Sequence, residues 1–248
     1  MSGHSKWHNI KLKKGKVDAQ RGALFTKLSK EIILAAKGGS ADPEANYRLK
    51  MAVEKAREHN VPQENIKRAI ARAGGGADEK QIEELRYEGY GPAGVAVIVD
   101  AATDNRNRTA SELRFLFNRN DGTLGESGSV GWMFEPRGII DVKPGGMSED
   151  ALTERALVDG VIDVRFDSEL TEIVTGPTAL MAVKDELEAA GLKIAGARLT
   201  MEAKQTVHPD DADAAKVVTF LEALEEHEDV QNVFSNAEFD AAALAALA

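Results

Sequence analysis

The spacing of apolar residues changes once along this chain, from helical to strand-like, and this change limits the folds that it can adopt. Over residues 21–37, Leu24, Leu28 and Ile32 share one side of a helical wheel. Two more helices are expected before residue 76, the first of them beginning at Asp42 and Pro43. After residue 84 the pattern becomes strand-like, as in the β-branched run GVAVIVDA. The sequence therefore predicts a multidomain α+β protein that begins with a small helical domain.

The stretch from residue 135 to residue 205 contains a complete supersecondary pattern. Its expected elements are strand 137–143, helix 148–158, strand 161–166, strand 169–175, helix 177–190 and strand 194–203. The order βαββαβ is the split βαβ, or ferredoxin-like, arrangement. One of the two α+β domains is therefore expected to be ferredoxin-like.

The segments on either side of that pattern cannot each form a domain alone. A strand at 94–101, a helix at 104–120 capped by Asp104 and a strand-like stretch at 129–134 precede it; a helix at 210–227 and a strand near 229–234 follow it. Insertion is tolerated where the ends of a domain lie close together. The predicted division is a basic arm 1–20, a helical domain 21–76, a discontinuous α+β domain 77–134 plus 206–239 and an inserted ferredoxin-like domain 135–205.

The formal net charge of −10 hides a strong segregation of the two signs. Residues 1–76 hold 16 Lys and Arg against 7 Asp and Glu, a charge of +9, which leaves −19 for the remainder. Such asymmetry is typical of a basic module for a polyanion attached to an acidic body. The acids from Glu222 to Asp229 are interpreted as a solvated helix face.

The basic segment supplies the candidate nucleic-acid contacts. They are Lys6, Trp7, His8, Lys11, Lys13, Lys14, Lys16, Arg21, Lys27, Lys30, Lys37, Lys67, Arg68 and Arg72. Lysines would neutralise phosphates, and an aromatic ring among them can stack on an exposed base. For the helices the alternative is an ordinary solvated lysine-rich surface, whereas a polycationic arm with an embedded tryptophan gains nothing from packing.

A second candidate lies where a strand meets a helix in the acidic part of the chain. Arg106 and Arg108, with Arg114 and Arg119 further along, stand close to the expected helix N-terminus. They could grip a phosphate or an acidic partner. They could equally form a capping and salt-bridge cluster between neighbouring domains, and the sequence favours neither.

Other chemistries find little support in the sequence. The chain has no cysteine, which excludes disulfides, thiolate metal sites and a cysteine nucleophile. The glycines Gly89, Gly91 and Gly94 match a dinucleotide motif but precede a strand rather than open a helix, so a tight turn is the preferred interpretation. No metal, cofactor or catalytic constellation is expected, although an enzyme with a cleft between domains remains an alternative. No apolar run approaches the roughly 20 residues of a membrane helix, and a cytoplasmic location is expected.

Several motifs resemble those of the YebC/PmpR family in order along nearly the whole chain. They are Gly3-His4-Ser5-Lys6-Trp7, Arg21-Gly22, Leu24-Phe25-Thr26-Lys27, Tyr87-Glu88-Gly89-Tyr90-Gly91-Pro92, Thr103-Asp104-Asn105-Arg106-Asn107-Arg108-Thr109 and Gly128-Ser129-Val130. The chain departs from the family at His8, where alanine is more usual. The resemblance implies a helical domain and two α+β domains around a cleft, and a non-enzymatic cytoplasmic protein of a kind described as a probable transcriptional regulator that binds DNA.

The resemblance also implies other ligands. Mitochondrial relatives look like translational activators, bacterial relatives have been tied to ribosome function, and some family genes neighbour those for Holliday-junction processing. The leading hypothesis is a DNA-binding transcriptional regulator without catalytic activity. The alternatives are a factor that binds ribosomal or messenger RNA and a protein that binds branched DNA. The acidic α+β domains would repel nucleic acid, so they are expected to contact proteins or to orient the basic module.

Overall fold

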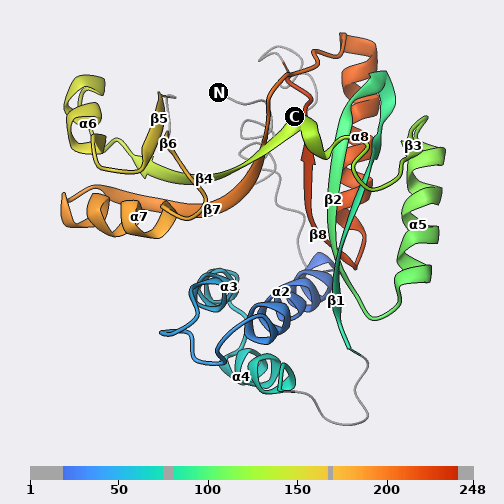
Figure 1. The fold of residues 1–248 in the computed structure, drawn as a ribbon, viewed down its shortest axis with the longest axis horizontal. Coiled ribbons are helices and arrows are strands. Elements are labelled where there is room, and N and C mark those ends of the chain that lie inside the picture. Colours follow the sequence, from blue (N-terminus) through green and yellow to red (C-terminus); the bar gives the residue numbers. More distant parts are fainter. Residues whose placement is uncertain (1–18, 75–80, 167–169, 240–248) are drawn as a thin grey trace.

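The computed structural model describes residues 19–74, 81–166 and 170–239. Within these ranges the chain forms seven α-helices and two four-stranded antiparallel sheets, in a mixed arrangement with a helical part at the N-terminal side (Figure 1). None of the described helices is long and apolar enough to span a membrane. The fold class predicted from the sequence, α+β with a ferredoxin-like unit, is confirmed.

The helical part consists of α2 (Ala19–Lys37), α3 (Tyr47–Glu58) and α4 (Gln63–Arg72). Leu28 and Ile32 of α2 pack with Leu49 of α3 and Ile66 of α4 in one buried cluster. The first helix agrees with the predicted periodicity. This cluster is the only core of the helical part among the described residues, so the three helices depend on one another.

The second helix begins later than predicted. The side chain of Asn46, not Asp42, accepts the backbone N–H of Leu49 and caps α3. Asp42 closes a turn instead, because its carboxylate accepts the N–H of Glu44. Asn46 is fixed in the capping position because its amide also donates to the carbonyl of Ala35 in α2.

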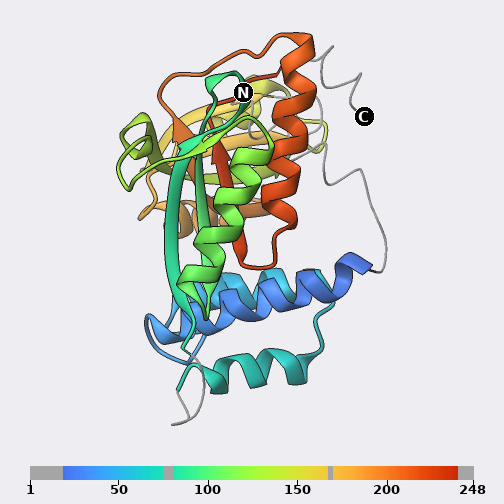
Figure 2. The same ribbon diagram turned by 90° about the vertical axis from the view of Figure 1, so that its right-hand side faces the viewer.

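The first sheet has the order β3-β1-β2-β8 and is covered on one face by two helices. Its strands are β1 (Glu83–Tyr90), β2 (Ala96–Thr103), β3 (Thr123–Leu124) and β8 (Val230–Ser235), and its helices are α5 (Arg106–Arg119) and α8 (Asp211–Glu226). The rings of Phe117 and Phe220 meet edge to face at 4.9 Å between these helices. Figure 2 shows α5 and α8 side by side over this sheet.

Strand β1 lies in a stretch for which the sequence analysis predicts no strand. Several of its residues are charged, and one of these, Glu88, is nevertheless buried. The glycines of the rejected dinucleotide motif lie at the end of β1 and in the turn Pro92–Gly94 that leads to β2. A Cβ on Gly89 would lie 2.5 Å from the carbonyl oxygen of Thr123, so this glycine lets β3 approach.

The second sheet has the order β5-β6-β4-β7, the ferredoxin-like order with the first and third strands in the centre. Its elements are β4 (Phe134–Lys143), α6 (Glu149–Ala156), β5 (Val161–Phe166), β6 (Thr171–Thr175), α7 (Leu180–Ala189) and β7 (Lys193–Ala203). The stretch predicted as a strand at 129–134 is instead a single 3-10 turn, Gly131–Met133, and the strand begins at Phe134. Ile140, Leu152 and Leu187 belong to the core between this sheet and its helices.

Several contacts hold the parts together, including Ala102 of β2, which joins the core of the helical part. Strands β4 and β7 extend as a ribbon towards the first sheet, where Phe134 joins Ile98 and Phe234 in a small core (Figure 1). Tyr47 and Met51 of α3 pack against the core of the second sheet. Because β8 pairs with β2 after the second sheet is complete, the strand pairings support the domain boundaries predicted above, and we propose the same division.

Candidate nucleic-acid interface

Half of the predicted nucleic-acid contacts lie beyond what the structure describes. Lys6, Trp7, His8, Lys11, Lys13, Lys14 and Lys16 fall outside the described residues, and the side chain of Arg21 is likewise not described. The described candidates belong to α2 and α4, and these two helices place them differently.

Helix α4 presents its cations to solvent. Its apolar side chains Ile66 and Ala69 are buried against α2, which leaves Lys67, Arg68 and Arg72 exposed on the other side of the helix. Lys67 forms an exposed ion pair with Glu64 at 3.1 Å, of the kind that contributes little to stability. A ligand can therefore displace Glu64 at low cost.

The lysines of α2 contact the protein itself. The ammonium of Lys27 donates to the carbonyl of Glu225, and that of Lys30 lies 2.6 Å from the carboxylate of Asp229. Lys37, at the end of α2, approaches the side-chain oxygen of Gln81 at 3.4 Å. The structure thus separates the candidates of α2, which hold the helical part to its neighbours, from those of α4.

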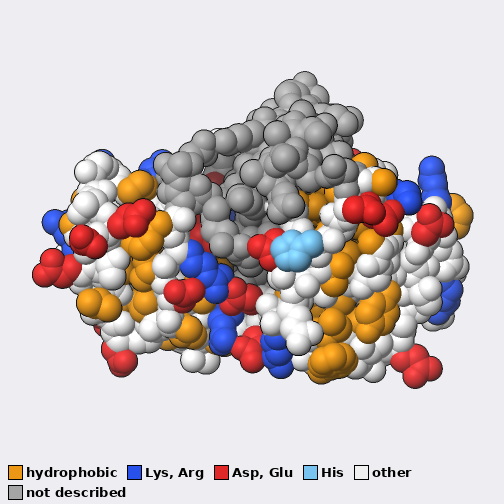
Figure 3. Space-filling model, turned by 90° about the horizontal axis from the view of Figure 1, so that it is seen from above, with side chains coloured by type: hydrophobic (Ala, Val, Ile, Leu, Met, Phe, Trp, Pro, Cys, Tyr) orange, Lys and Arg blue, Asp and Glu red, His pale blue; other side chains and the backbone are white. Residues whose placement is uncertain are grey.

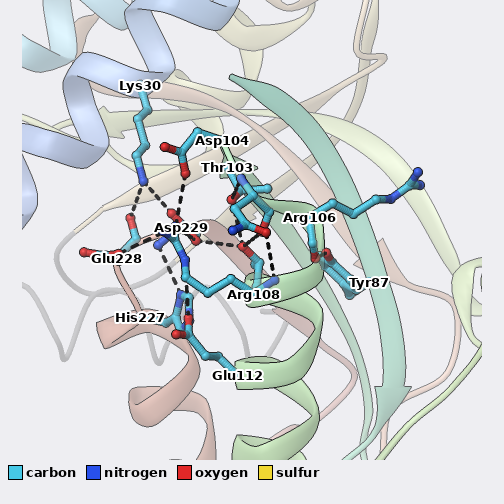
Figure 4. Close-up of polar contacts among 12 residues, drawn as sticks. Lys30, Tyr87, Thr103, Asp104, Arg106, Arg108, Glu112, His227, Glu228 and Asp229 are labelled. Carbon is cyan, nitrogen blue, oxygen red and sulfur yellow. Dashed lines mark hydrogen bonds and ion pairs between the residues drawn. The ribbon is translucent and has the colours of Figure 1, made fainter. Parts of the chain in front are cut away.

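Asp229 is the centre of a buried ion-pair junction between α2, α5 and the turn after α8 (Figure 4). Its side chain is completely buried and accepts from Lys30, from Arg108 at 2.8 Å and from the hydroxyl of Thr109 at 2.7 Å. Burial raises the pKa of this carboxyl, but the hydrogen bonds from these three donors outweigh it and hold the pKa far below its usual range. These donors therefore favour the ionised form of Asp229 in the folded protein.

The placement of Asp229 corrects the interpretation of the acids 222–229 as one solvated face. Helix α8 ends before His227, whose Nδ1 accepts the N–H of Asp229 and turns the chain inward. Helix α5 is capped by Asn105 rather than by Asp104, because the side-chain oxygen of Asn105 accepts the N–H of Arg108. A sequence signal for this junction exists only in hindsight: Asp229 directly precedes the buried strand residue Val230.

The two arginines of the second candidate behave differently. Arg108 is held by Asp229, with Asp104 at 3.4 Å and Glu228 at 3.7 Å, which matches the salt-bridge interpretation. The side chain of Arg106 is exposed and points away from that cluster in Figure 4. Within the described residues the guanidinium of Arg106 makes no ion pair, so it can still meet an anion.

Glu88 organises a loop that sequence reasoning missed. Its carboxylate accepts the backbone N–H groups of Gly128, Val130 and Gly131, at 3.0, 2.8 and 2.6 Å. Burial raises the pKa of this carboxyl, but the three hydrogen bonds bring it below the usual value. The loop holds Trp132 with its side chain largely exposed. The available sequence signal for a buried acid was the position of Glu88 between Tyr87 and Tyr90.

The described side chains offer one cluster with metal-like spacing. Ligand atoms of Glu112, His227 and Asp229 lie within 4.8 Å of one another. However, Lys30 and Arg108 already neutralise Asp229, and Glu112 lies 2.9 Å from His227, so the protein's own groups satisfy this cluster. We assign it to the junction rather than to a metal. A shallow depression beside it is lined by Ser111, Glu112, Phe115, Leu116, His227 and Glu228. Among the described contacts His227 pairs with Glu112 at 2.9 Å, and no hydrogen bond joins it to the hydroxyl of Ser111.

Family comparisons match both parts of the chain. The family model described as the TACO1/YebC protein N-terminal domain matches residues 5–76, and that described as the TACO1/YebC second and third domain matches residues 82–237. The chain belongs to the TACO1/YebC family. The resemblance found in the sequence motifs is thereby confirmed, and the TACO1/YebC N-terminal domain is the part that carries the exposed cations of α4.

Full-length relatives of this TACO1/YebC protein have regulatory names. Proteins from Pelotomaculum thermopropionicum and Moorella thermoacetica, each called a probable transcriptional regulatory protein, are 51% identical. The alignments cover 97% and 98% of this chain and 100% and 97% of those proteins. The crystal structure of a conserved hypothetical protein from Aquifex aeolicus is similar with a TM-score of 0.82 and 47% identity, over 91% of this chain and 93% of that one.

Proposed function

We propose that this protein is a cytoplasmic, non-catalytic regulator that binds nucleic acid through its N-terminal domain, and that DNA at promoters is its ligand. The observation that carries the proposal is the charge segregation, +9 in residues 1–76 against −19 in the remainder, together with the exposure of Lys67, Arg68 and Arg72 on α4. A positive module on a negative body gathers a polyanion on one side only. The regulatory names of the relatives support the same proposal.

We assign a different role to the acidic α+β domains, which follow residue 76. Acidic and basic side chains are interspersed over the face between the two sheets, and no basic patch dominates the described part of that face (Figure 3). The net charge of −19 beyond residue 76 repels phosphates overall. We propose that these domains orient the N-terminal domain and contact a protein partner.

Ribosomal or messenger RNA is the second candidate ligand, because Trp7 lies among the arm's lysines and an indole ring stacks best on unpaired bases. Branched DNA is the third. Promoter DNA, RNA and branched DNA would all use the same phosphate contacts. The first test therefore asks whether the cations of α4 bind nucleic acid. The same titration also shows which of the three ligands binds most tightly.

The test compares the wild-type protein with the double variant Lys67→Gln/Arg68→Gln. Labelled 20-nucleotide single-stranded RNA, duplex DNA and a four-way DNA junction are titrated at several salt concentrations. The double variant is expected to bind more weakly and to flatten the plot of log affinity against log salt by about 1.8 for duplex DNA and about 1.4 for single strands.

The matched control is Lys143→Gln/Arg155→Gln, which removes two exposed cations from the second-sheet part of the molecule. It should leave both affinity and slope unchanged. Equal losses in the two double variants would mean that net charge alone is measured, and an unaltered slope in the α4 variant would overturn the interface. The tightest of the three ligands decides between promoter DNA, RNA and branched DNA.

A further inference from the structure

The outward face of α5 combines cations with an exposed aromatic ring. Thr109, Leu113 and Phe117 are buried against the sheet. The opposite side is formed by exposed side chains, namely Asn107, Ser111, Arg114, Phe115, Asn118 and Arg119. Figures 1 and 2 show this helix on the outside of the molecule, with no described element over its outer face.

The charges of α5 are not balanced by its surroundings. The helix has four arginines and one acid, Glu112, which lies against His227. Arg108 is used by the buried junction, whereas Arg106, Arg114 and Arg119 make no ion pair within the described part of the chain. The chain beyond residue 76 holds 34 acidic and 15 basic residues, so carboxylates that could pair with these arginines are abundant in this part of the protein.

Three arginines of the second sheet are neutralised by the protein itself, whereas Arg155 of α6 is exposed and makes no ion pair within the described residues. Arg137, Arg165 and Arg198 each meet at least one carboxylate, such as Glu202 at 2.5 Å from Arg165 and Glu172 at 3.0 Å from Arg198. On the outward side of α5, Arg114 and Arg119 are exposed and have no such partner among the described residues. A face of this kind is complementary to a polyanion.

The aromatic ring narrows the class of polyanion. Phe115 is 62% exposed and lies four positions before Arg119, so the two side chains are neighbours on the solvent side of the helix. It borders a shallow depression that is also lined by Leu116, His227 and the acids Glu112 and Glu228. An exposed ring beside a guanidinium is suited to an unpaired base whose phosphate is neutralised next to it. An acidic peptide would use the arginines but leave the ring unused.

We propose that the outward face of α5 is a second nucleic-acid contact, in which Arg114 and Arg119 bind phosphates and Phe115 stacks on an unpaired base. This inference rests on the proposed function and extends it to the acidic body. The N-terminal end of α5 adjoins α2 through Asp229. From Asn107 to Arg119 the helix rises about 18 Å, enough for several nucleotides.

The experiment uses the full-length protein and the same 20-nucleotide single-stranded RNA and duplex DNA. In Arg114→Gln/Arg119→Gln the salt slope for the single strand should fall by about 1.4, as for two lost phosphate contacts. Phe115→Ala should weaken single-strand binding about tenfold, leave duplex binding nearly unchanged and keep the slope. Lys143→Gln/Arg155→Gln again serves as the control, and circular dichroism with thermal melting checks that each variant is folded.

The outcomes separate this inference from the proposed function. If the α4 variant binds weakly while both α5 variants bind like wild type, the α5 contact is wrong and the N-terminal interface stands. If wild type binds none of the probes, both proposals fail. Polyglutamate at equal charge concentration should not displace the RNA; displacement that is abolished by Arg114→Gln/Arg119→Gln would assign the face to an acidic protein instead.

Discussion

At the scale of single residues, the junction around Asp229 shows how one carboxylate can hold distant segments together. Lys30 reaches it from a position 199 residues earlier in the chain, and Arg108 from α5. Asp229 is fully buried and Lys30 is mostly buried, whereas Arg108 remains about 36% exposed, so the carboxylate depends most on its partners. Removal of one partner leaves a buried charge without compensation, which costs more than the pair itself contributes.

We expect Asp229→Asn to lower the free energy of unfolding by about 3 kcal/mol at pH 7, because Lys30 and Arg108 lose their anion. Urea denaturation at pH 7 measures this change. Asp213→Asn, which removes an exposed partner of Lys216, should change stability by less than about 1 kcal/mol. A similar cost for both variants would contradict the junction.

The same residue predicts a pH dependence. The pKa of Asp229 is lower in the folded protein than its ordinary value of 3.8, so the unfolded chain binds a proton first. Its contribution is complete well above pH 3.8 and is lost as the pH falls below that value. The stability difference between wild type and Asp229→Asn should therefore shrink between pH 5 and pH 2; a constant difference would mean that the carboxyl is not the cause.

At the scale of elements, the turn between β1 and β2 explains the glycines that imitate a nucleotide motif. A Cβ on Gly91 would lie 2.4 Å from the ring of Phe220, so here the backbone passes directly over a helix side chain. The glycine is required by packing of α8 on the hairpin. This requirement belongs to the contact between two elements and not to a ligand.

Two glycine-to-alanine substitutions should therefore change the free energy of unfolding in opposite directions. Gly91→Ala is expected to lower the free energy of unfolding by about 1–3 kcal/mol, since the fully buried ring of Phe220 has no room to move. Gly22→Ala lies in α2 with nothing within 4 Å of the added carbon, so it should raise stability by about 0.5–1 kcal/mol. Chemical denaturation of both variants is the measurement, and a stable Gly91→Ala would refute the packing argument.

At the scale of the whole molecule, the two sheets meet in a core of their own. Phe134 at the start of β4 packs with Ile98 and Phe234 of the first sheet, and Met201 of β7 lies against the same cluster. This core is small compared with those under each sheet. It couples two units that could otherwise unfold separately.

We expect Phe134→Ala to lower the free energy of unfolding by about 3 kcal/mol and to split the calorimetric transition into two, because the cavity removes the contact between the sheets. Differential scanning calorimetry measures both effects. The control is Leu157→Ala, whose side chain is 75% exposed and should be neutral. One unchanged transition in Phe134→Ala would show that the sheets are held together by other contacts.

Elements with a local sequence signal could be predicted before any contact was known. The helical period of α2 and the order βαββαβ were both predicted, because each depends on neighbours a few positions apart. The motifs from Gly3 to Val130 determined the family in the same way. Strand β1 was missed because its buried polar residue, Glu88, is satisfied by a loop forty residues later.

Only the tertiary structure decided which charges are free. Lys30 and Arg68 are indistinguishable as members of basic helices, yet one is held by Asp229 and the other is exposed to solvent. The pairing of Lys30 depends on a contact across 199 positions, which no local pattern encodes. Burial and ion pairing are set by where the chain returns in space, and they decide which cations can bind another molecule.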